Sequence, residues 1–355
     1  MRRKVNMNRT KLDEMFEKTG VEVLISEAPQ TRIWYAGVET SDGFIAIEKD
    51  KATLFVDGRY IEYCKNHAKN VEVVLIKGDS MSKWFEQRAF KKIALEKNYL
   101  TKQVETRILD MVQPESVEWV DAAYLRIVKS EDEIAKLQKV IDISLKSYDD
   151  FMKQVKPGMT EKEGAALLNY IMKTNGADKE GFDEIIATAS ASAEPHHHPT
   201  DKKLEEGELL KVDFGARYNG FTADITRTTI LGGKEKVKNP KALEILEIVE
   251  EAARRGRAAV RPGILASEVD KVCRDYIKEK GYADYFVHST GHGLGIDVHE
   301  WPSVSQYSKF VLEPGMVLTV EPGIYIEGLG GARIEDDVLV TETGHIVLSR
   351  KHENA

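Results

Sequence analysis

The sequence predicts two domains, a smaller α/β domain over residues 1–125 and a larger α+β domain over residues 126–355. A chain of 355 residues is longer than a single hydrophobic core usually supports, so two domains are expected. In the first part, short runs of Val, Ile and Leu alternate with helical segments, which is typical of α/β folds. In the second part, amphipathic helices come in pairs before strand hairpins, which indicates an α+β fold.

The first domain is expected to contain short strands that are rich in β-branched and other apolar residues. These segments are Val21–Ser26, Gly43–Glu48, Ala52–Val56, Val71–Ile76 and Lys92–Glu96. Between the last two, residues Ser80–Phe90 show the spacing of a helix. The pair Trp34-Tyr35, followed by Gly37, lies in a stretch that resembles a loop. Exposed aromatics of this kind often anchor a subunit interface, but packing inside their own domain is the favoured interpretation.

The second domain opens with a capping box, in which Ser130 and Glu133 mark the start of a long amphipathic helix. The apolar positions of this helix are Ile134, Leu137, Ile141 and Leu145. Thr160 and Glu163 form a second capping box, and Gly176 is expected to end the helix that follows.

The rest of the second domain is predicted to contain strands over residues 182–230, two helices, and further strands to the end of the chain. The two helices are expected over Lys241–Val260 and Ala266–Lys280. A helix pair followed by a hairpin therefore occurs twice, which suggests an internal duplication.

Composition and charge exclude several classes of function. The formal net charge of −8 argues against nucleic-acid binding, which requires an excess of Lys and Arg. No stretch approaches the roughly 18 apolar residues of a membrane-spanning helix, and the opening MRRKVNMNRTKLDEMF lacks the apolar run of a secretory signal. Cys64 and Cys273 lie far apart and are expected to be free thiols. We therefore expect a cytoplasmic protein that binds neither nucleic acid nor membrane.

The segment LLKVDFGARYNGFTADITRTTIL predicts a hairpin that carries two aspartates. Asn219-Gly220 is a strong hairpin turn signal between two runs of β-forming residues. With this turn at the centre, Asp213 and Asp224 are diagonal neighbours on one face, because side chains alternate with period two. Two unpaired carboxylates on one face would repel, so we expect a positive group between them. Solvent-facing positions on an edge strand are the alternative.

A second cluster, VHSTGHGLGIDVHEWP, contains three of the nine histidines of the chain, His288, His292 and His299. The glycines between them let the backbone pass close to a ligand. A single histidine is more often a core or surface residue, but three histidines threaded through glycines indicate a binding site.

A third cluster lies in MVLTVEPGIYIEGLGGARIEDDVLV, where a strand, a glycine-rich connection and a second strand are expected. Glu321 ends the first strand, and Glu335 begins the second, two residues after Arg333. These glutamates repeat the arrangement of the aspartate pair on a second hairpin. A solvated acidic turn at residues 335–337 is the alternative.

Together the three clusters supply four carboxylates and several imidazoles, but no thiolate. Such an oxygen-rich set suits Mn²⁺, Fe²⁺, Co²⁺ or Zn²⁺ better than a structural zinc site of the cysteine type, and Mn²⁺ is the first expectation. Four anionic ligands exceed the need of one divalent ion. The sequence therefore predicts a hydrolytic site for two divalent metal ions that carboxylates bridge.

These motifs resemble the proline-specific branch of the pita-bread metallopeptidases, the group of Xaa-Pro dipeptidase (prolidase) and aminopeptidase P. The resemblance covers nearly the whole chain and is densest over residues 182–343. It implies an α+β protein, in which a pita-bread catalytic domain follows a smaller α/β domain of the creatinase type. The segment DGRY at residues 57–60 is similar to that smaller domain. The metal ligands that the resemblance implies are Asp213, Asp224, His292, Glu321 and Glu335.

The resemblance also implies residues that act on the substrate. These catalytic residues are Glu321, His288, His299, His196 and Arg333. His196 follows from EPHHHPTD, which is similar to the family pattern L-P-H-H-x-P-T-D. Glu194 stands where that pattern usually has an apolar residue, and this departure concerns the lining of the pocket rather than the metals.

The implied reaction is hydrolysis of Xaa-Pro bonds in short peptides with proline at the second position. A hydroxide that bridges the two metals attacks the carbonyl, Glu321 carries the proton, and His288 or His299 stabilises the oxyanion. Because the bond before proline has no N–H, an apolar slot shaped for the ring can favour it. The resemblance also implies a homodimer, in which the amino-terminal domain of one subunit borders the active site of the other.

Three alternatives stand beside this interpretation. A methionine aminopeptidase has a similar ligand set, but His288, Arg333 and the additional amino-terminal 125 residues favour the proline-specific branch. The complete ligand set argues against a non-catalytic binding module on the same fold and against a creatine amidinohydrolase. The choice between a dipeptidase and an aminopeptidase P stays open, because it depends on the room behind the proline.

Overall fold

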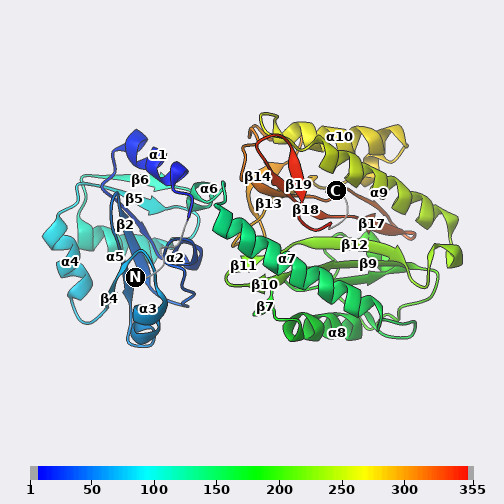
Figure 1. Ribbon diagram of the computed structural model, residues 1–355, viewed down its shortest axis with the longest axis horizontal. Helices are drawn as coiled ribbons and strands as arrows, with labels where there is room; N and C mark the ends of the chain where they lie inside the picture. Colours follow the sequence, from blue (N-terminus) through cyan, green and yellow to red (C-terminus); the bar gives the residue numbers. More distant parts are fainter. Residues whose placement is uncertain (1–6, 351–355) are drawn as a thin grey trace. The chain divides into compact units, whose positions relative to one another are not determined.

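The computed structural model describes residues 7–350, which form two compact units (Figure 1). The first unit ends at Glu133, and the second begins at Ile134, inside helix α7 (Glu131–Met152). The boundary expected after residue 125 lies at the end of the short helix α6 (Ala122–Leu125).

The two ends of the chain fall outside this description. Residues 1–6, which include the basic start of the sequence, and residues 351–355 are not described. Within the part that is described, no helix is both long and apolar enough to cross a membrane.

The first unit contains a six-stranded mixed sheet in the order β4-β3-β2-β1-β5-β6. The pairs β1–β2 and β2–β3 are antiparallel, and the other pairs are parallel. The strands are β1 (Val23–Ser26), β2 (Phe44–Glu48), β3 (Ala52–Val56), β4 (Glu72–Leu75), β5 (Lys92–Glu96) and β6 (Ser116–Val120). The helices besides α6 are α1 (Thr10–Thr19), α2 (Pro29–Ala36), α3 (Ile61–His67), α4 (Ser80–Arg88) and α5 (Lys102–Val112). The five expected strands and α4 are confirmed, whereas β6, with polar and partly exposed residues, was not predicted.

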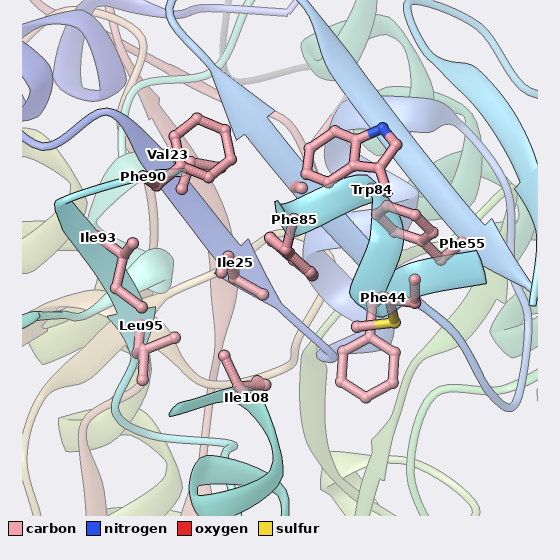
Figure 2. Close-up of a cluster of buried hydrophobic side chains, with 12 residues drawn as sticks. Val23, Ile25, Phe44, Phe55, Trp84, Phe85, Phe90, Ile93, Leu95 and Ile108 are labelled. Atoms are coloured by element: carbon pink, nitrogen blue, oxygen red, sulfur yellow. The ribbon is translucent and has the colours of Figure 1, made fainter. Parts of the chain in front are cut away.

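Figure 2 shows the hydrophobic cluster that joins this sheet to helices α4 and α5. Phe55 of β3 packs edge-to-face against Trp84 at a ring-centroid distance of 5.1 Å, and Phe85 stacks on Phe55 at 6.1 Å. Ile108 of α5 is fully buried in the same cluster. Aromatic pairs of this kind contribute about 0.5–1.5 kcal/mol each beyond the burial of their area. The first unit therefore has a hydrophobic core of its own.

The structure decides between the two interpretations of Trp34 and Tyr35, and it replaces the expected loop with a helix. Both lie in helix α2 and are buried, with exposed fractions of 2% and 3%. Pro29 begins this helix, and Gly37 follows its end with a φ of 69°, which glycine adopts readily. A helix of about two turns is too short to show a helical period in the sequence. The two rings pack inside their own unit and are not exposed interface anchors.

The second unit begins with the two helices that the capping boxes predict. Ser130 and Glu133 exchange hydrogen bonds of 2.8 and 3.3 Å at the start of α7. Thr160 and Glu163 exchange bonds of 2.8 and 3.1 Å before α8 (Glu161–Thr174). Each box satisfies backbone N–H groups that have no partner within the helix, and both helix starts are confirmed.

The remaining elements of the second unit form small sheets with a second helix pair, α9 (Pro240–Ala259) and α10 (Ala266–Glu279). The strands before this pair are β7 (Lys179–Glu180), β8 (Ile185–Thr188), β9 (Leu209–Phe214), β10 (Ala216–Tyr218), β11 (Phe221–Thr222) and β12 (Ile225–Ile230). The strands after it are β13 (Gly291–Gly293), β14 (Glu300–Val304), β15 (Val317–Val320), β16 (Gly323–Ile326), β17 (Gly330–Arg333), β18 (Asp336–Val340) and β19 (His345–Val347). Helix α8 contacts β7 and β8, and α9 contacts β15, β16 and β17. Helix α9 also packs beside α10 (Figure 1).

The first hairpin has the register that its turn predicts. Asn219 and Gly220 both have positive φ, 49° and 80°, as a two-residue hairpin turn of the primed type requires. Tyr218 pairs with Phe221, and the same register continues into the longer strands, where Asp213 pairs with Thr226. This register places Asp224 diagonally from Asp213, as predicted.

The second hairpin differs in its connection. Val320 pairs with Asp336 between β15 and β18, and Gly323 pairs with Arg333 between β16 and β17, in one continuous register. The connection that we expected to be only glycine-rich is therefore itself a pair of short strands. In this register, Glu321 and Glu335 lie opposite each other, between the β15–β18 pair and the β16–β17 pair.

Candidate metal centre

The five expected ligands converge on one cavity of about 430 Å³. Asp213 lies in β9 and Asp224 directly before β12. His292 lies in β13, Glu321 directly after β15, and Glu335 directly before β18. The same cavity is also lined by the other residues predicted to act on substrate, His196, His288, His299 and Arg333.

His292 faces the carboxylates through one ring nitrogen. Ligand atoms of Asp224, His292 and Glu335 all lie within 4.8 Å of one another. Nε2 of His292 lies 3.5 Å from Oδ2 of Asp224 and 3.3 Å from Oε1 of Glu321. Nδ1 of the same ring lies 3.1 Å from the carbonyl oxygen of Gly293, to which it can donate. That bond places a proton on Nδ1 and leaves Nε2 available to a metal ion, the arrangement usual for metal-binding histidines.

The carboxylates are buried close to one another. Burial, followed by repulsion from Glu335, Asp213 and Glu321, raises the pKa of Asp224 well above its ordinary value. Burial and repulsion from Glu321 and Asp213 raise the pKa of Glu335 in the same way. In the described part of the chain, Oδ1 of Asp213 is buried without a hydrogen-bond partner. A set of buried, mutually repelling oxygen ligands with one imidazole fits divalent cations, which would offset the repulsion.

Glu321 behaves differently because it lies beside His292. Burial alone raises the pKa of Glu321, but the hydrogen bond and the charge of His292 outweigh this effect and lower the pKa below its ordinary value. Oε1 of Glu321 also accepts a hydrogen bond of 3.2 Å from Oγ1 of Thr319. The structure therefore favours an ionised carboxylate at this position.

Arg333 is buried, and its guanidinium binds protein groups around the cavity. Nη2 donates to Oδ2 of Asp213, and Nε donates to Oγ1 of Thr226 at 3.0 Å. Nη1 donates to the hydroxyl of Tyr325 at 2.9 Å, and that hydroxyl lies 2.9 Å from Nε2 of His288. Arg333 thus holds a predicted ligand and, through Tyr325, a predicted catalytic histidine.

The three histidines expected to act on substrate have different surroundings. Nδ1 of His288 lies 2.7 Å from the carbonyl oxygen of Ser289, so both of its nitrogens have partners. His299 lies with its ring centroid 4.2 Å from that of His292, and it has no hydrogen-bond partner among residues 7–350. Burial, and then the nearby His292, lowers the pKa of His299. His196 is exposed at the cavity.

Sequence reasoning missed three residues that orient the site. Thr226 donates to Oε2 of Glu335 at 2.6 Å, Thr319 donates to Glu321, and Tyr325 joins Arg333 to His288. Each threonine lies two positions along the chain from a predicted ligand, Thr226 from Asp224 and Thr319 from Glu321, so the period of two would have identified both. Tyr325 lies four positions after Glu321, and no local pattern separates it from an ordinary strand tyrosine.

Two other sequence features are not among the residues that line the cavity. In the DGRY segment, Arg59 and Asp57 form an exposed ion pair of 2.6 Å within the first unit. Cys64 and Cys273 are both buried free thiols, as predicted.

Comparison with known proteins places the chain in a family. A model of metallopeptidase family M24 matches residues 135–342, and a model of the creatinase/prolidase N-terminal domain matches residues 9–129. The Xaa-Pro dipeptidase of Pyrococcus furiosus is 38% identical over 337 residues, which cover 94% of this chain and 95% of that protein.

Solved structures agree with this match. The Xaa-Pro dipeptidase from Bacillus anthracis is 35% identical, with a TM-score of 0.90 and coverage of 96% of both chains. The X-Pro aminopeptidase from Thermotoga maritima is 34% identical, with a TM-score of 0.88 and coverage of 96% of this chain and 97% of that chain. The chain therefore belongs to metallopeptidase family M24, and the predicted α+β fold, with a pita-bread domain after a creatinase-type domain, is confirmed.

Proposed function

From this family membership, we propose that the chain is a two-metal peptidase that hydrolyses the bond before proline in short peptides. The observation that carries the proposal is the convergence of four carboxylates and Nε2 of His292 on one cavity. We assign Asp213, Asp224, His292, Glu321 and Glu335 as ligands of two divalent ions. Mn²⁺ is the first candidate, followed by Co²⁺, Fe²⁺ and Zn²⁺. The substrate class is supported by the relatives named for cleavage of Xaa-Pro bonds.

Glu321 is the proposed proton carrier. When bound, two divalent ions supply a water that loses a proton near neutral pH and a Lewis acid for the scissile carbonyl. An ionised Glu321 can accept a proton at the oxygen that Thr319 does not hold. Passing this proton to the proline nitrogen completes the cleavage, because that nitrogen leaves as an amine.

We propose that His299 donates to the developing oxyanion. His288 already has partners at both ring nitrogens, whereas His299 lines the cavity without one in the described chain. A donor aimed at the oxyanion acts strongly in a site from which water is partly excluded. In this scheme His288 holds the wall of the cavity beside Tyr325, His196 contacts the substrate, and Arg333 positions Asp213.

A peptidase assay tests the proposal directly. A cavity of about 430 Å³ is within the range of small-ligand sites and suits a short peptide. Gly-Pro, Ala-Pro and Arg-Pro-Pro are incubated in parallel with added Mn²⁺, with Gly-Ala and Arg-Ala-Pro as controls without proline at the second position. Cleavage of the dipeptides alone identifies a dipeptidase, and cleavage of Arg-Pro-Pro identifies an aminopeptidase.

The same assay separates the alternatives. Release of methionine from Met-Ala-Ser in preference to all proline peptides supports a methionine-aminopeptidase-like enzyme. Failure to cleave any of these peptides, in protein that binds Mn²⁺, contradicts the proposal and favours a binding module.

We also propose a homodimer in the cytoplasm. The supporting observation for the dimer is the family resemblance alone, since the Trp34-Tyr35 pair is buried. Light scattering at the working concentration tests the dimer, and a fully active monomer contradicts it.

A further inference from the structure

The loop that carries His196 contains an ionic contact that the proposed reaction does not use. Nδ1 of His197 lies 2.8 Å from Oε2 of Glu194, and its Nε2 lies 2.8 Å from Oε2 of Glu161. The side chains of His197 and Glu161 are 6% and 0% exposed, whereas that of Glu194 is 70% exposed. The imidazole is therefore held between a buried carboxylate and a carboxylate at the surface.

Glu161 is a rigid anchor for this ring. It is the first residue of α8, and its carboxylate accepts hydrogen bonds from the backbone N–H of Thr188 at 3.0 Å and of Thr200 at 3.0 Å. The hydroxyl of Thr200 donates to it at 2.7 Å. Burial raises the pKa of Glu161, but the bonds from Thr200 and His197 outweigh burial and lower the pKa below its ordinary value. An ionised Glu161 thus ties α8, β8 and the far end of the loop to His197.

The near end of the loop is held through its backbone. Nζ of Lys211 donates to the carbonyl oxygens of Ser192 at 3.1 Å and Glu194 at 2.6 Å. Nη1 of Arg333 donates to the carbonyl oxygen of Pro195 at 3.2 Å. Because the backbone of Glu194 is already fixed, its side chain loses less conformational freedom when it reaches His197.

We propose that Glu161, His197 and Glu194 form a clamp that positions the neighbouring His196, and that Glu194 is a positioning residue for the peptidase reaction. A ring held at both nitrogens cannot turn without losing a hydrogen bond, so it restrains the backbone of the residue before it. The motif that the chain resembles has an apolar residue at the position of Glu194. This chain has an ionic contact there instead. The inference rests on the proposed function, because it concerns how His196 meets the substrate.

Substitution of Glu194 tests the clamp without disturbing the core. Glu194→Leu introduces the apolar type of the family motif, and Glu194→Gln keeps an acceptor without the charge. Glu205→Leu is the matched control, because Glu205 is 64% exposed, pairs with Lys238 and does not line the cavity.

We expect Glu194→Leu to raise KM for an Xaa-Pro peptide roughly five- to tenfold with kcat within about twofold, since a looser His196 weakens substrate and transition-state binding alike. Glu194→Gln recovers part of this loss, and Glu205→Leu matches the wild type. Metal content and Tm stay at their wild-type values in all three variants, because an ion pair with an exposed partner contributes little to stability.

Two further measurements separate positioning from a structural role. Backbone amide exchange at residues 196–201 is expected to rise several-fold in Glu194→Leu but not in Glu205→Leu. In a double-mutant cycle, Glu194→Leu adds nothing to the KM of His197→Asn if Glu194 acts through His197. If His197→Asn does not fold, the exchange measurement and the Glu194 variants decide the question.

The outcomes are distinct. Wild-type KM and wild-type exchange in Glu194→Leu overturn the clamp, and so does a lower Tm with an unchanged KM. Failure of the wild-type protein to cleave Xaa-Pro peptides with Mn²⁺ contradicts the proposed function instead, and the exchange measurement still tests the clamp.

Discussion

Glu335 and Asp336 are consecutive in the chain, yet they lie in opposite electrostatic surroundings. Side chains alternate along a strand, so Glu335 faces the cavity and Asp336 faces away from it. Asp336 is fully buried and accepts hydrogen bonds from three guanidinium groups. These come from Arg227 at 2.9 Å, Arg257 at 2.9 Å and Arg350 at 2.8 Å. Among the described residues that line the cavity, Arg333 is the one arginine, and its guanidinium contacts one of the four proposed carboxylate ligands, Asp213.

The pKa shifts follow this difference. Burial raises the pKa of Asp336, but the arginines outweigh it and lower the pKa below its ordinary value. Burial and neighbouring acids raise the pKa of Glu335 well above its ordinary value. A buried carboxylate that stabilises the fold is supplied with cations by the protein itself, whereas a group of carboxylates left without enough cations is suited to bind metal ions. The two sites should therefore respond in opposite ways to chelation, substitution and pH.

Removal of metal is expected to have the largest effect. Chelation should abolish peptidase activity, because the remaining groups provide neither the activated water nor the Lewis acid, and Mn²⁺ should restore it. Activity before and after dialysis against a chelator measures this effect, with elemental analysis as the control. Full activity in protein shown to be free of metal contradicts the assignment.

The next largest effect is expected from Asp224→Asn. Loss of one anionic ligand should reduce activity by roughly 10²–10³-fold at saturating Mn²⁺, because the metal ions are no longer held correctly. The metal-free variant should be no less stable than the metal-free wild type, since one source of repulsion is gone. Turnover and chelator-treated Tm test both parts, and near wild-type turnover would show that Asp224 is not a ligand.

His299→Ala and His288→Ala sharpen the comparison inside the cavity. Both residues lie beside the carboxylates without being assigned as ligands, so both variants should keep their metal. We expect His299→Ala to lose roughly 10²-fold in kcat as a proposed oxyanion donor, and His288→Ala to lose less. Elemental analysis alongside the kinetics is the check. Loss of about one equivalent of metal in either variant shows that the wrong histidine was assigned as a ligand.

Asp336→Asn tests the other side of the strand. It leaves three guanidinium groups around a neutral amide, and breaking a buried ion pair usually costs about 3–5 kcal/mol. We expect the free energy of unfolding to fall by about this amount, with the same metal content and nearly the same kcat in the folded fraction. Urea unfolding and metal analysis measure these quantities. If the variant is as stable as the wild type but has lost metal, the prediction that Asp336 stabilises the fold and does not support the metal site is contradicted.

The dependence of stability on pH should show the smallest and most graded effect. The raised pKa values of Asp224 and Glu335 mean that the metal-free fold binds protons more tightly than the unfolded chain. The two groups contribute fully to the free energy of unfolding below a pH of about 4. This contribution is lost as the pH rises through the folded pKa values, and the free energy of unfolding then falls by up to about 1.4 kcal/mol per pH unit for each group. The lowered pKa of Asp336 has the opposite consequence. Asp336 contributes to the free energy of unfolding above a pH of about 4, and this contribution is lost as the pH falls below that value.

Urea unfolding between pH 5 and 8 separates these contributions. The metal-free protein should become less stable as the pH rises, and Mn²⁺ should remove the slope by neutralising the carboxylates. The same slope with and without Mn²⁺ contradicts the prediction.

Much of the candidate site could be predicted because its proposed ligands occur in local patterns. The Asn219-Gly220 turn sets the register of the first hairpin, and the register places Asp213 and Asp224 on one face. The end of one expected strand and the start of the next likewise singled out Glu321 and Glu335. Helix starts at Ser130 and Thr160 were predictable for the same reason, because a capping box spans only four residues.

The sequence by itself therefore determined which acids share a face and where the helices begin, but not which cations they meet. Arg227, Arg257 and Arg350 reach Asp336 from β12, from α9 and from the segment after β19. The clamp on His197 likewise joins α8 to a loop more than 30 residues further along the chain. Local spacing decides the face on which a side chain lies. Only the packing of distant segments decides whether a buried charge is neutralised by the protein or left for a ligand.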